Sequence, residues 1–422
     1  MIILAARDHV FANKGIGAAG SGIFAACLER MMPQDADLVV VEFTVNEDDD
    51  AAFFSPSRRR FEQMLRKLLL LGVARSGKGN NDSVWGLPDD RQTGGGVAVV
   101  VLHHYAWHAA VGDGRAAGLF YNTSEAQLGM FANFYDLPQV SMRNAMWPLM
   151  AAGVDGFKVN KVRKPNVPRL GGGTVPAAAA GERDAYLFFD QMHPADLGHK
   201  AMAEALAGPL RRALTEELSR GVRGGRQQFA WERGIPPPMV PGNQEFPTAL
   251  CAMQEDFCQM VVRHSQGFAY RAERPNKPTR LEQKWGWSGF KPGEWVDMVF
   301  DSREHNDSRN RERKVIATLI FLRSYENMGT ARVACFSGCR CRNTTIDGTW
   351  SKRASLMQHH SFEVSQHQQC LVNIEIQEAP GKVPSGGHKV AIMALIVTTF
   401  PLHLGSLSTS YELAASHASQ EG

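Results

Sequence analysis

The segment Asp190–His199, which reads DQMHPADLGH, carries the side chains best suited to acid–base chemistry. Asp190 precedes His193 by three residues, where an apolar stretch gives way to a helix-like one. At this spacing a carboxylate can accept a hydrogen bond from the imidazole Nδ1–H, which leaves Nε2 free as a general base. Pro194 then keeps the following helix from starting early. The pattern predicts His193 as a catalytic base and Asp190 as its orienting partner.

Two further elements could complete such a site. Residues 13–21 read NKGIGAAGS, a glycine-rich turn whose backbone N–H groups could bind an anion, although its spacing is not GxGxxG and a plain turn is the alternative. Asn46 directly follows a β-branched run, and ligands of open α/β sheets bind beyond the carboxyl ends of the strands. Alternatively, Asn46 is a turn or capping residue. The acidic run Glu47–Asp50 is interpreted as a solvated loop, with no metal.

Strand-like and helix-like stretches alternate through the first half, which favours a mostly parallel sheet in an α/β layer. A β-branched run such as Asp37–Val45 is typical of a strand covered on both faces. The expected strands are His9–Asn13, Asp37–Val45, Val97–His103, Leu137–Ser141 and, last, Ala185–Phe189; the expected helices are Ser21–Met31, Pro56–Leu71, Ser124–Phe134 with Ser124 as N-cap, and one after His193.

The second half has a different pattern. Short strand candidates separated by turns predict an antiparallel β-sandwich over residues 285–400. Its expected strands are Trp295–Phe300, Lys314–Leu322, Thr330–Cys335, Ser361–Val364, Cys370–Ile376 and Lys389–Thr398. We therefore divide the chain into four parts. The first domain covers 1–218 and contains a flexible insertion at 164–182, and a Pro/Gly-rich linker with Cys251 and Cys258 covers 219–284. The sandwich follows, and 401–422 form a disordered tail.

The three chemical elements, in this order, resemble blocks II, III and V of the SGNH (GDSL-type) hydrolases, in the plant and algal subgroup with a C-terminal β-domain. The matching segments are NKGIGAAGSGIFAAC, DADLVVVEFTVNE and DQMHPADLGH, and RSYENMGTARVACFSGC resembles the subgroup's second domain. The resemblance implies a flavodoxin-like three-layer α/β domain. It also implies hydrolysis of a carboxylic ester, possibly a carbohydrate O-acetyl ester, by Ser-His-Asp chemistry without a cofactor.

The resemblance assigns roles residue by residue. His193 matches the base, Asp190 its carboxylate, and Asn46 the amide of the oxyanion hole. Gly17 and Ala18 match the turn that supplies the oxyanion N–H; the family has glycine at the position of Ala18, but the donor is a backbone group. Glu47 stands where the family has aspartate.

The nucleophile departs from the family pattern. The family's serine lies at the end of the first strand, upstream of the glycine turn, and the twelve residues before Asn13 contain no serine. We therefore expect the chain to lack its first strand and its nucleophile, and to be truncated or inactive as it stands. Because that strand is central in the flavodoxin-like order, its loss would leave two unpaired strand edges.

Cysteines and sequons favour a secreted or Golgi protein, although the chain carries no recognisable signal peptide. Cys335, Cys339, Cys341 and Cys370 cluster late in the chain, where either disulfides or, with spacing unlike a usual zinc site, a metal could form. The four Asn-x-Ser/Thr sequons are at Asn81, Asn122, Asn306 and Asn343.

Composition excludes several classes. A net charge of +3 over 422 residues gives no basic field for nucleic acid, and no apolar run is long enough to cross a bilayer. The expected partner is a small-molecule or carbohydrate ester. The alternative is a non-catalytic protein that binds glycan or protein, with sugar stacking on tryptophans 285, 287 and 295 unless these are core residues. The histidines at 103, 104 and 108 either line the crevice or are ordinary loop residues.

Overall fold

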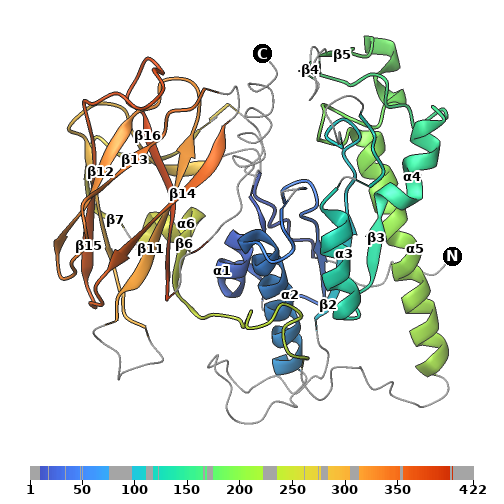
Figure 1. Cartoon of the computed structure of the whole chain (residues 1–422), viewed down its shortest axis with the longest axis horizontal. Coiled ribbons are helices and arrows are strands. Elements are labelled where there is room, and N and C mark those ends of the chain that lie inside the picture. Colours follow the sequence, from blue (N-terminus) through green and yellow to red (C-terminus); the bar gives the residue numbers. More distant parts are fainter. Residues whose placement is uncertain are drawn as a thin grey trace. The chain divides into compact units, whose positions relative to one another are not determined.

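A computed structural model describes most of the chain in two compact units (Figure 1). One unit comprises the described residues of 37–245, and the other those of 10–36 together with 246–402. The described residues are 10–17, 19–33, 35–47, 49, 51–75, 97–110, 117–121, 123–164, 167–168, 174–221, 235–260, 262–273, 275–276, 284–304, 313–351, 355–399 and 402. Apart from residue 402, the predicted tail lies outside them.

A parallel sheet of three strands organises residues 37–245. The strands are β1 (Leu38–Val41), β2 (Ala98–His103) and β3 (Gln139–Ser141), in that spatial order. β1 pairs directly with β2, so the expected pair of unpaired edges does not occur between them. The expectation that the first run is covered on both faces is wrong for β1, where Leu38 and Val40 are 40% and 43% exposed.

A helix follows each strand of this sheet and a further one follows the His193 turn; the sequence predicted all of them except the helix after the third strand. They are α2 (Pro56–Arg75), α3 (Glu125–Phe134), α4 (Met142–Ala151) and α5 (Asp196–Gly221). Val100 and Leu102, on one face of β2, pack with apolar residues of α4 and α5. The alternate residues Val99 and Val101 are buried too, so both faces of β2 are covered.

The predicted last strand, Ala185–Phe189, does not join the sheet. A short 3₁₀ helix, η1 (Ala180–Ala185), precedes it, and only isolated bridges join Tyr186 to Lys158 and Phe188 to Pro194. The apolar run is explained by burial rather than by pairing, because Tyr186 and Phe188 belong to the core under α4 and α5. Within the predicted flexible insertion, β4 (Val167–Pro168) pairs with β5 (Thr174–Val175).

Part of the predicted linker packs on the α/β unit. Residues 235–245 lie against α2, where the Glu62 carboxylate accepts hydrogen bonds from the N–H groups of Met239 and Val240 at 2.5 and 3.2 Å. The amide of Asn243 donates to the same carboxylate at 2.6 Å, and Tyr135 Oη donates at 2.7 Å. A polar helix face is thereby buried without leaving its carboxylate unpaired.

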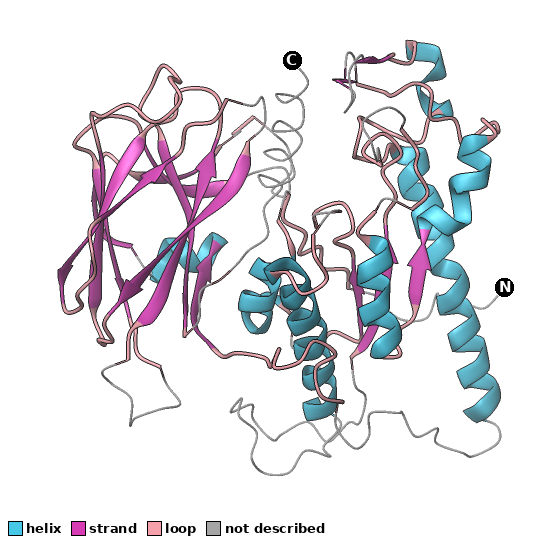
Figure 2. Cartoon of the chain, viewed as in Figure 1, coloured by secondary structure: helices cyan, strands magenta, loops and turns pink. Residues whose placement is uncertain are grey.

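The second unit is built on an antiparallel sandwich of two sheets (Figure 2). One sheet has the order β13-β12-β15-β10-β7; the other has β14-β11-β16-β9-β8, with β6 also paired to β16. The elements are β6 (Thr248–Met253), α6 (Gln254–Met260), β7 (Val262–Gln266), β8 (Ala269–Ala272), β9 (Trp285–Gly289), β10 (Trp295–Phe300), β11 (Val315–Arg323), β12 (Thr330–Ser337), β13 (Thr344–Asp347), β14 (Leu356–Val364), β15 (Cys370–Ile376) and β16 (Val390–Thr398). The sandwich therefore begins before residue 285.

The first helix, α1 (Ser21–Met31), belongs to the sandwich unit. Cys27 forms a disulfide with Cys251 of β6, and Ile23 and Ala26 pack in one core cluster with Ile396 of β16. This grouping differs from the expected domain of residues 1–218. The strand expected over His9–Asn13 is not formed in its described part, 10–13. Val10 and Phe11 are exposed there, and these residues pair with no strand.

None of the helices in the described part of the chain combines the length and the apolar character that crossing a membrane requires.

Candidate active site

Asp190 and His193 form a close pair in a tight turn. The ring Nδ1 of His193 lies 2.9 Å from each carboxylate oxygen of Asp190. The same carboxylate accepts the backbone N–H groups of Met192 and His193 at 2.9 and 2.8 Å, and Phe189 N–H donates to His193 C=O at 2.8 Å. These bonds fix the turn and the ring together, as the spacing of the motif predicts.

The pair is electrostatically polarised. Burial opposes ionisation of Asp190, but the hydrogen bonds from the His193 ring and from the backbone outweigh it and lower the pKa of this carboxyl to about 2. The hydrogen bond to Asp190 raises the pKa of His193, against a smaller effect of burial. The His193 side chain is 74% exposed, and that of Asp190 is 17% exposed. The carboxylate is thus held in place while the outer edge of the imidazole meets solvent.

His104 and Gly198 support the buried side of this turn. His104 Nε2 lies 3.0 Å from the carbonyl oxygen of Met192, and burial lowers the pKa of His104 to about 4, so a neutral ring donates this bond. In α5, a Cβ on Gly198 would lie 2.5 Å from Leu187 O and 2.8 Å from Pro194 Cβ. Only glycine lets the helix approach the turn so closely.

Asn46 lies in the loop after β1, and His103 at the end of β2 contacts this loop. His103 Nδ1 lies 3.1 Å from Thr44 Oγ1, and Asn46 N–H donates to Phe43 C=O at 2.9 Å. His103 and His104 are consecutive, so one contacts the Asn46 loop and the other the His193 turn. This places both loops at the carboxyl edge of β1 and β2, where an α/β sheet binds ligands.

Two acidic residues of the same loop have structural partners. Glu47 forms an ion pair with Arg58 at 3.8 Å and accepts a hydrogen bond from Ser57 Oγ, so it anchors the first turn of α2 rather than lying in solvent as expected. Glu42 Oε1 accepts Thr44 N–H at 2.8 Å, and burial raises the pKa of Glu42 to about 7 against hydrogen bonds from the backbone of Thr44 and His104. The sequence did not single out Glu42, because it lies inside the apolar run Asp37–Val45.

The other predicted oxyanion residues fall elsewhere. Gly17 is exposed in a turn that Ala19 N–H closes onto Ile16 C=O at 3.2 Å, and it belongs to the sandwich unit. Ala18 lies outside the described residues. Asn46, Asp190 and His193 all belong to the α/β unit. The oxyanion roles of Gly17, Ala18 and Asn46 stay predictions.

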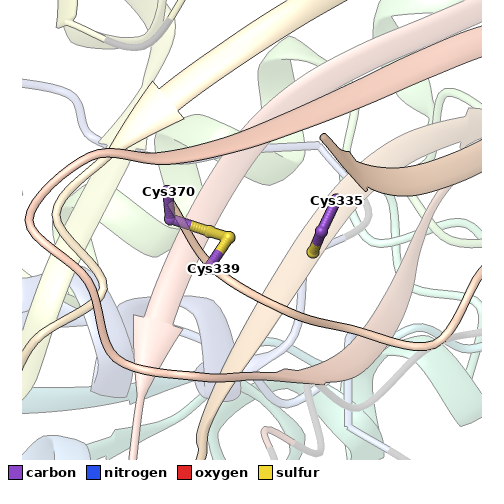
Figure 3. Close-up of side chains that lie close together, drawn as sticks. All are labelled: Cys335, Cys339 and Cys370. Atoms are coloured by element: carbon purple, nitrogen blue, oxygen red, sulfur yellow. A yellow bond between two sulfur atoms is a disulfide. The ribbon is translucent and has the colours of Figure 1, made fainter. Parts of the chain in front are cut away.

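Four late cysteines form disulfides. Cys335 bonds Cys341 and Cys339 bonds Cys370, while the sulfur atoms of Cys335, Cys339 and Cys370 lie within 4.8 Å of one another (Figure 3). A disulfide sulfur is not a thiolate, so in this state these side chains do not offer the ligands of a zinc site.

The tryptophans considered for sugar stacking are half-buried in the sandwich. Tyr270 stacks on Trp285 with ring centroids 5.6 Å apart and meets Trp287 at 6.0 Å, and Trp287 packs against the core. Trp295 Nε1 donates to Gln266 Oε1 at 3.0 Å. These contacts serve packing of the sheet.

A hollow of about 210 Å³ lies at the start of α5. It is lined by Arg163, Arg183, Asp184, Tyr186, Asp196, Leu197 and Lys200. None of the predicted site residues lines it. Arg163, one of the lining residues, forms ion pairs with Asp196 at 2.6 Å and with Asp184 at 3.3 Å. These ion pairs between lining residues partly close the hollow.

No protein-family model and no curated protein matches the sequence. Two solved structures share the fold, both of a two-domain esterase (CEX) active on acetylated mannans. One has a TM-score of 0.51 and 15% identity and covers 92% of this chain and 80% of the esterase. The other, co-crystallised with mannopentaose, has a TM-score of 0.50 and 15% identity, with 93% and 80% covered. Because the matches cover 92% and 93% of this chain, the likeness extends over both the α/β unit and the sandwich unit.

Proposed function

We propose that this chain is a carbohydrate ester hydrolase of the SGNH type, with His193 as general base and Asp190 as its orienting carboxylate. The observation that carries the proposal is the contact between His193 Nδ1 and both oxygens of Asp190 at 2.9 Å, with the rest of the ring exposed. The fold shared with an esterase active on acetylated mannans supports a carbohydrate ester as the substrate.

The chemistry follows from the pair. His193 Nε2 takes a proton from the oxygen that attacks the ester carbonyl, and Asp190 stabilises the imidazolium that forms. The side-chain amide of Asn46 is proposed to bind the oxyanion. When the carbonyl re-forms, the sugar oxygen leaves and takes the proton from His193, which gives a free hydroxyl and a carboxylic acid.

We propose that water supplies the attacking oxygen in this chain, because among the described residues no hydrogen bond joins the His193 ring to a serine hydroxyl. The family's serine enzyme would exceed such a rate by about 10⁴–10⁶. We therefore expect slow acetate release and no labelling by a serine-directed fluorophosphonate. A label that depends on His193 would instead identify a serine nucleophile within the chain.

The test is acetate release from acetylated mannan by the wild-type chain and two histidine variants. General-base catalysis contributes about 10²–10⁴ in rate, so His193→Ala should lose about a hundredfold or more. His199→Ala is the matched control, because His199 is also exposed and lies six residues further along. Equal rates in all three proteins would reject the assignment of His193, and retention on mannan without acetate release would favour a non-catalytic glycan-binding protein.

We also propose that the protein works in an oxidising compartment, in the secretory pathway or outside the cell. The three disulfides Cys27–Cys251, Cys335–Cys341 and Cys339–Cys370 support this, because such bonds rarely persist in the cytosol. Asn343, in the one sequon that the structure describes, is exposed and accessible to glycosylation.

A further inference from the structure

Two adjacent aromatic side chains are exposed on the loop between β2 and α3. Phe120 is 41% exposed and Tyr121 is 73% exposed. Two large exposed rings side by side form an apolar patch, and a contiguous patch of this kind points to a binding site more than a single exposed ring does.

The Phe120 ring is held rather than free to turn. The Arg143 guanidinium lies 4.6 Å from its centroid, and the Trp147 ring meets it edge-on at 5.6 Å. Arg143 Nη1 also donates to Phe120 C=O at 2.8 Å, and Trp147 Nε1 donates to Gly118 C=O at 2.7 Å. Gly118 has φ +83°, and a Cβ there would collide with the Trp107 ring. The loop is therefore shaped to present the ring in one orientation.

This loop joins the two parts of the candidate site. At its end, Ser124 Oγ donates to Thr44 C=O at 2.6 Å and Ser124 N–H donates to Asp49 at 2.5 Å, on either side of Asn46 in the chain. At its beginning, His104 contacts the carbonyl of Met192 next to His193. The exposed rings thus lie on a segment that is bonded to the Asn46 loop at one end and to the His193 turn at the other.

The charge around the rings favours an uncharged ligand. The Arg143 guanidinium, which is the cation next to Phe120, is paired with Glu125 at 3.3 Å, and both side chains are nearly buried, at 11% and 6% exposed. A flat apolar ring next to a neutralised ion pair suits the C–H face of a sugar, whose slightly positive hydrogens meet the negative face of the ring.

We propose that Phe120 and Tyr121 form a stacking platform for a neutral pyranose unit of the polysaccharide that carries the ester. This inference rests on the proposed function, since it names where the chain of the substrate lies beside the ester-cleaving site. The platform binds sugar, and the His193–Asp190 pair acts on the acyl group.

The test is affinity electrophoresis of the full chain in gels that contain deacetylated mannan. That probe carries no ester, so retardation does not depend on hydrolysis. Stacking on an aromatic ring is worth about 0.5–1.5 kcal/mol, so Tyr121→Ala should raise the apparent dissociation constant about two- to tenfold, and Phe120→Ala with Tyr121→Ala should raise it further. Phe336→Ala is the control, because Phe336 is 58% exposed on β12 of the other unit and should leave retardation unchanged.

Phe120 packs on Trp147, so loss of binding in its variant alone could reflect a disturbed loop. Tyr121→Ala removes an exposed ring and keeps the test sharp. Wild-type retardation that neither Tyr121→Ala nor the double variant weakens would overturn the platform, as would a wild-type chain that mannan does not retard. Tyr121-dependent binding without acetate release would keep the platform and reject the hydrolase, whereas acetate release without Tyr121-dependent binding would do the reverse.

Discussion

The two units of the chain bury different kinds of polar side chain. In residues 37–245 the buried set includes charged and imidazole groups: Glu47, Arg58, Arg60, Glu62, Arg66, Lys67, His103, His104, His108 and Glu125. Among the described residues of 10–36 and 246–402, the buried polar side chains are only serines, threonines and one asparagine. Burial of charge is costly unless the group is paired or hydrogen-bonded. The α/β unit therefore maintains polar networks that the sandwich does without.

This difference bears on function. Polar groups that are buried and fixed shift pKa values and orient rings, and such groups gather at sites of chemistry. The sandwich instead holds together by apolar packing between its sheets and by disulfides, which suits a scaffold. The Asp190–His193 pair and its supporting histidine lie in the unit with buried charge.

The largest effect on stability is expected at Glu62. Glu62→Ala would leave the N–H groups of Met239 and Val240 and the Asn243 amide without their acceptor, which should destabilise residues 37–245 by about 3–5 kcal/mol. Hydrogen exchange followed by mass spectrometry would locate the loss in α2 and residues 235–245.

The isosteric change Glu62→Gln is the matched control and should cost less, because one oxygen still accepts. Lys314→Ala, which removes an exposed ion pair with Glu363 in the sandwich, should change stability by less than about 1 kcal/mol. If Glu62→Ala were as mild as Lys314→Ala, the contrast between the units would have no energetic meaning.

A somewhat smaller effect is expected from the disulfide of the sandwich unit. Replacing Cys27 and Cys251 together by serine should destabilise that unit by about 2–4 kcal/mol, because the bond closes a loop with a sequence separation of 224 residues. The measurement is exchange protection of α1 relative to β16. Protection of α1 that survives the double substitution would show that its apolar contacts suffice alone.

The smallest effect is a change in titration at the candidate site. Asp190→Asn removes the charge that raises the pKa of His193, so that pKa should fall towards the ordinary 6.5. In the wild type the pair makes its full contribution to stability between pH 3.8 and 6.5; this contribution is lost as pH rises through the raised pKa of His193, and also as pH falls towards about 2, where Asp190 becomes protonated.

NMR titration of the ring protons measures this directly and does not depend on turnover. His104, with a pKa of about 4, serves as an internal reference that Asp190→Asn should leave in place. An unchanged pKa of His193 in the variant would mean that the contact is not maintained in solution. If the hydrolase proposal holds, the pH at which activity rises should move down with this pKa.

Features that depend on local sequence were predictable. β10 and β15 have the bounds read from the sequence, Trp295–Phe300 and Cys370–Ile376, because alternation with period two is a local signal. The Asp190–His193 contact was predictable for the same reason, since its partners are three residues apart.

Features that depend on distant partners were not. Ser124 stands at the N-cap position of α3, as expected, but its side chain makes no capping hydrogen bond, and its hydroxyl donates instead to Thr44 C=O, 80 residues away in the chain. The spacing of the cysteines did not show that Cys27 pairs with Cys251, and this disulfide joins α1 to the sandwich unit. Glu62 reads as a surface residue of an amphipathic helix until residues 235–245 cover it. In each case a long-range contact outweighs the local pattern.

The Cys27–Cys251 bond has a consequence for biosynthesis. On the ribosome α1 is made early, whereas β6 and β16, against which it packs, emerge only after the whole of residues 37–245. At about 5–20 residues per second, the apolar face of this helix waits tens of seconds for its partner sheet. During that interval the nascent chain exposes the apolar face of α1 and a reduced thiol. Chaperones and oxidoreductases would therefore act first on α1, before the strands of the sandwich unit are made.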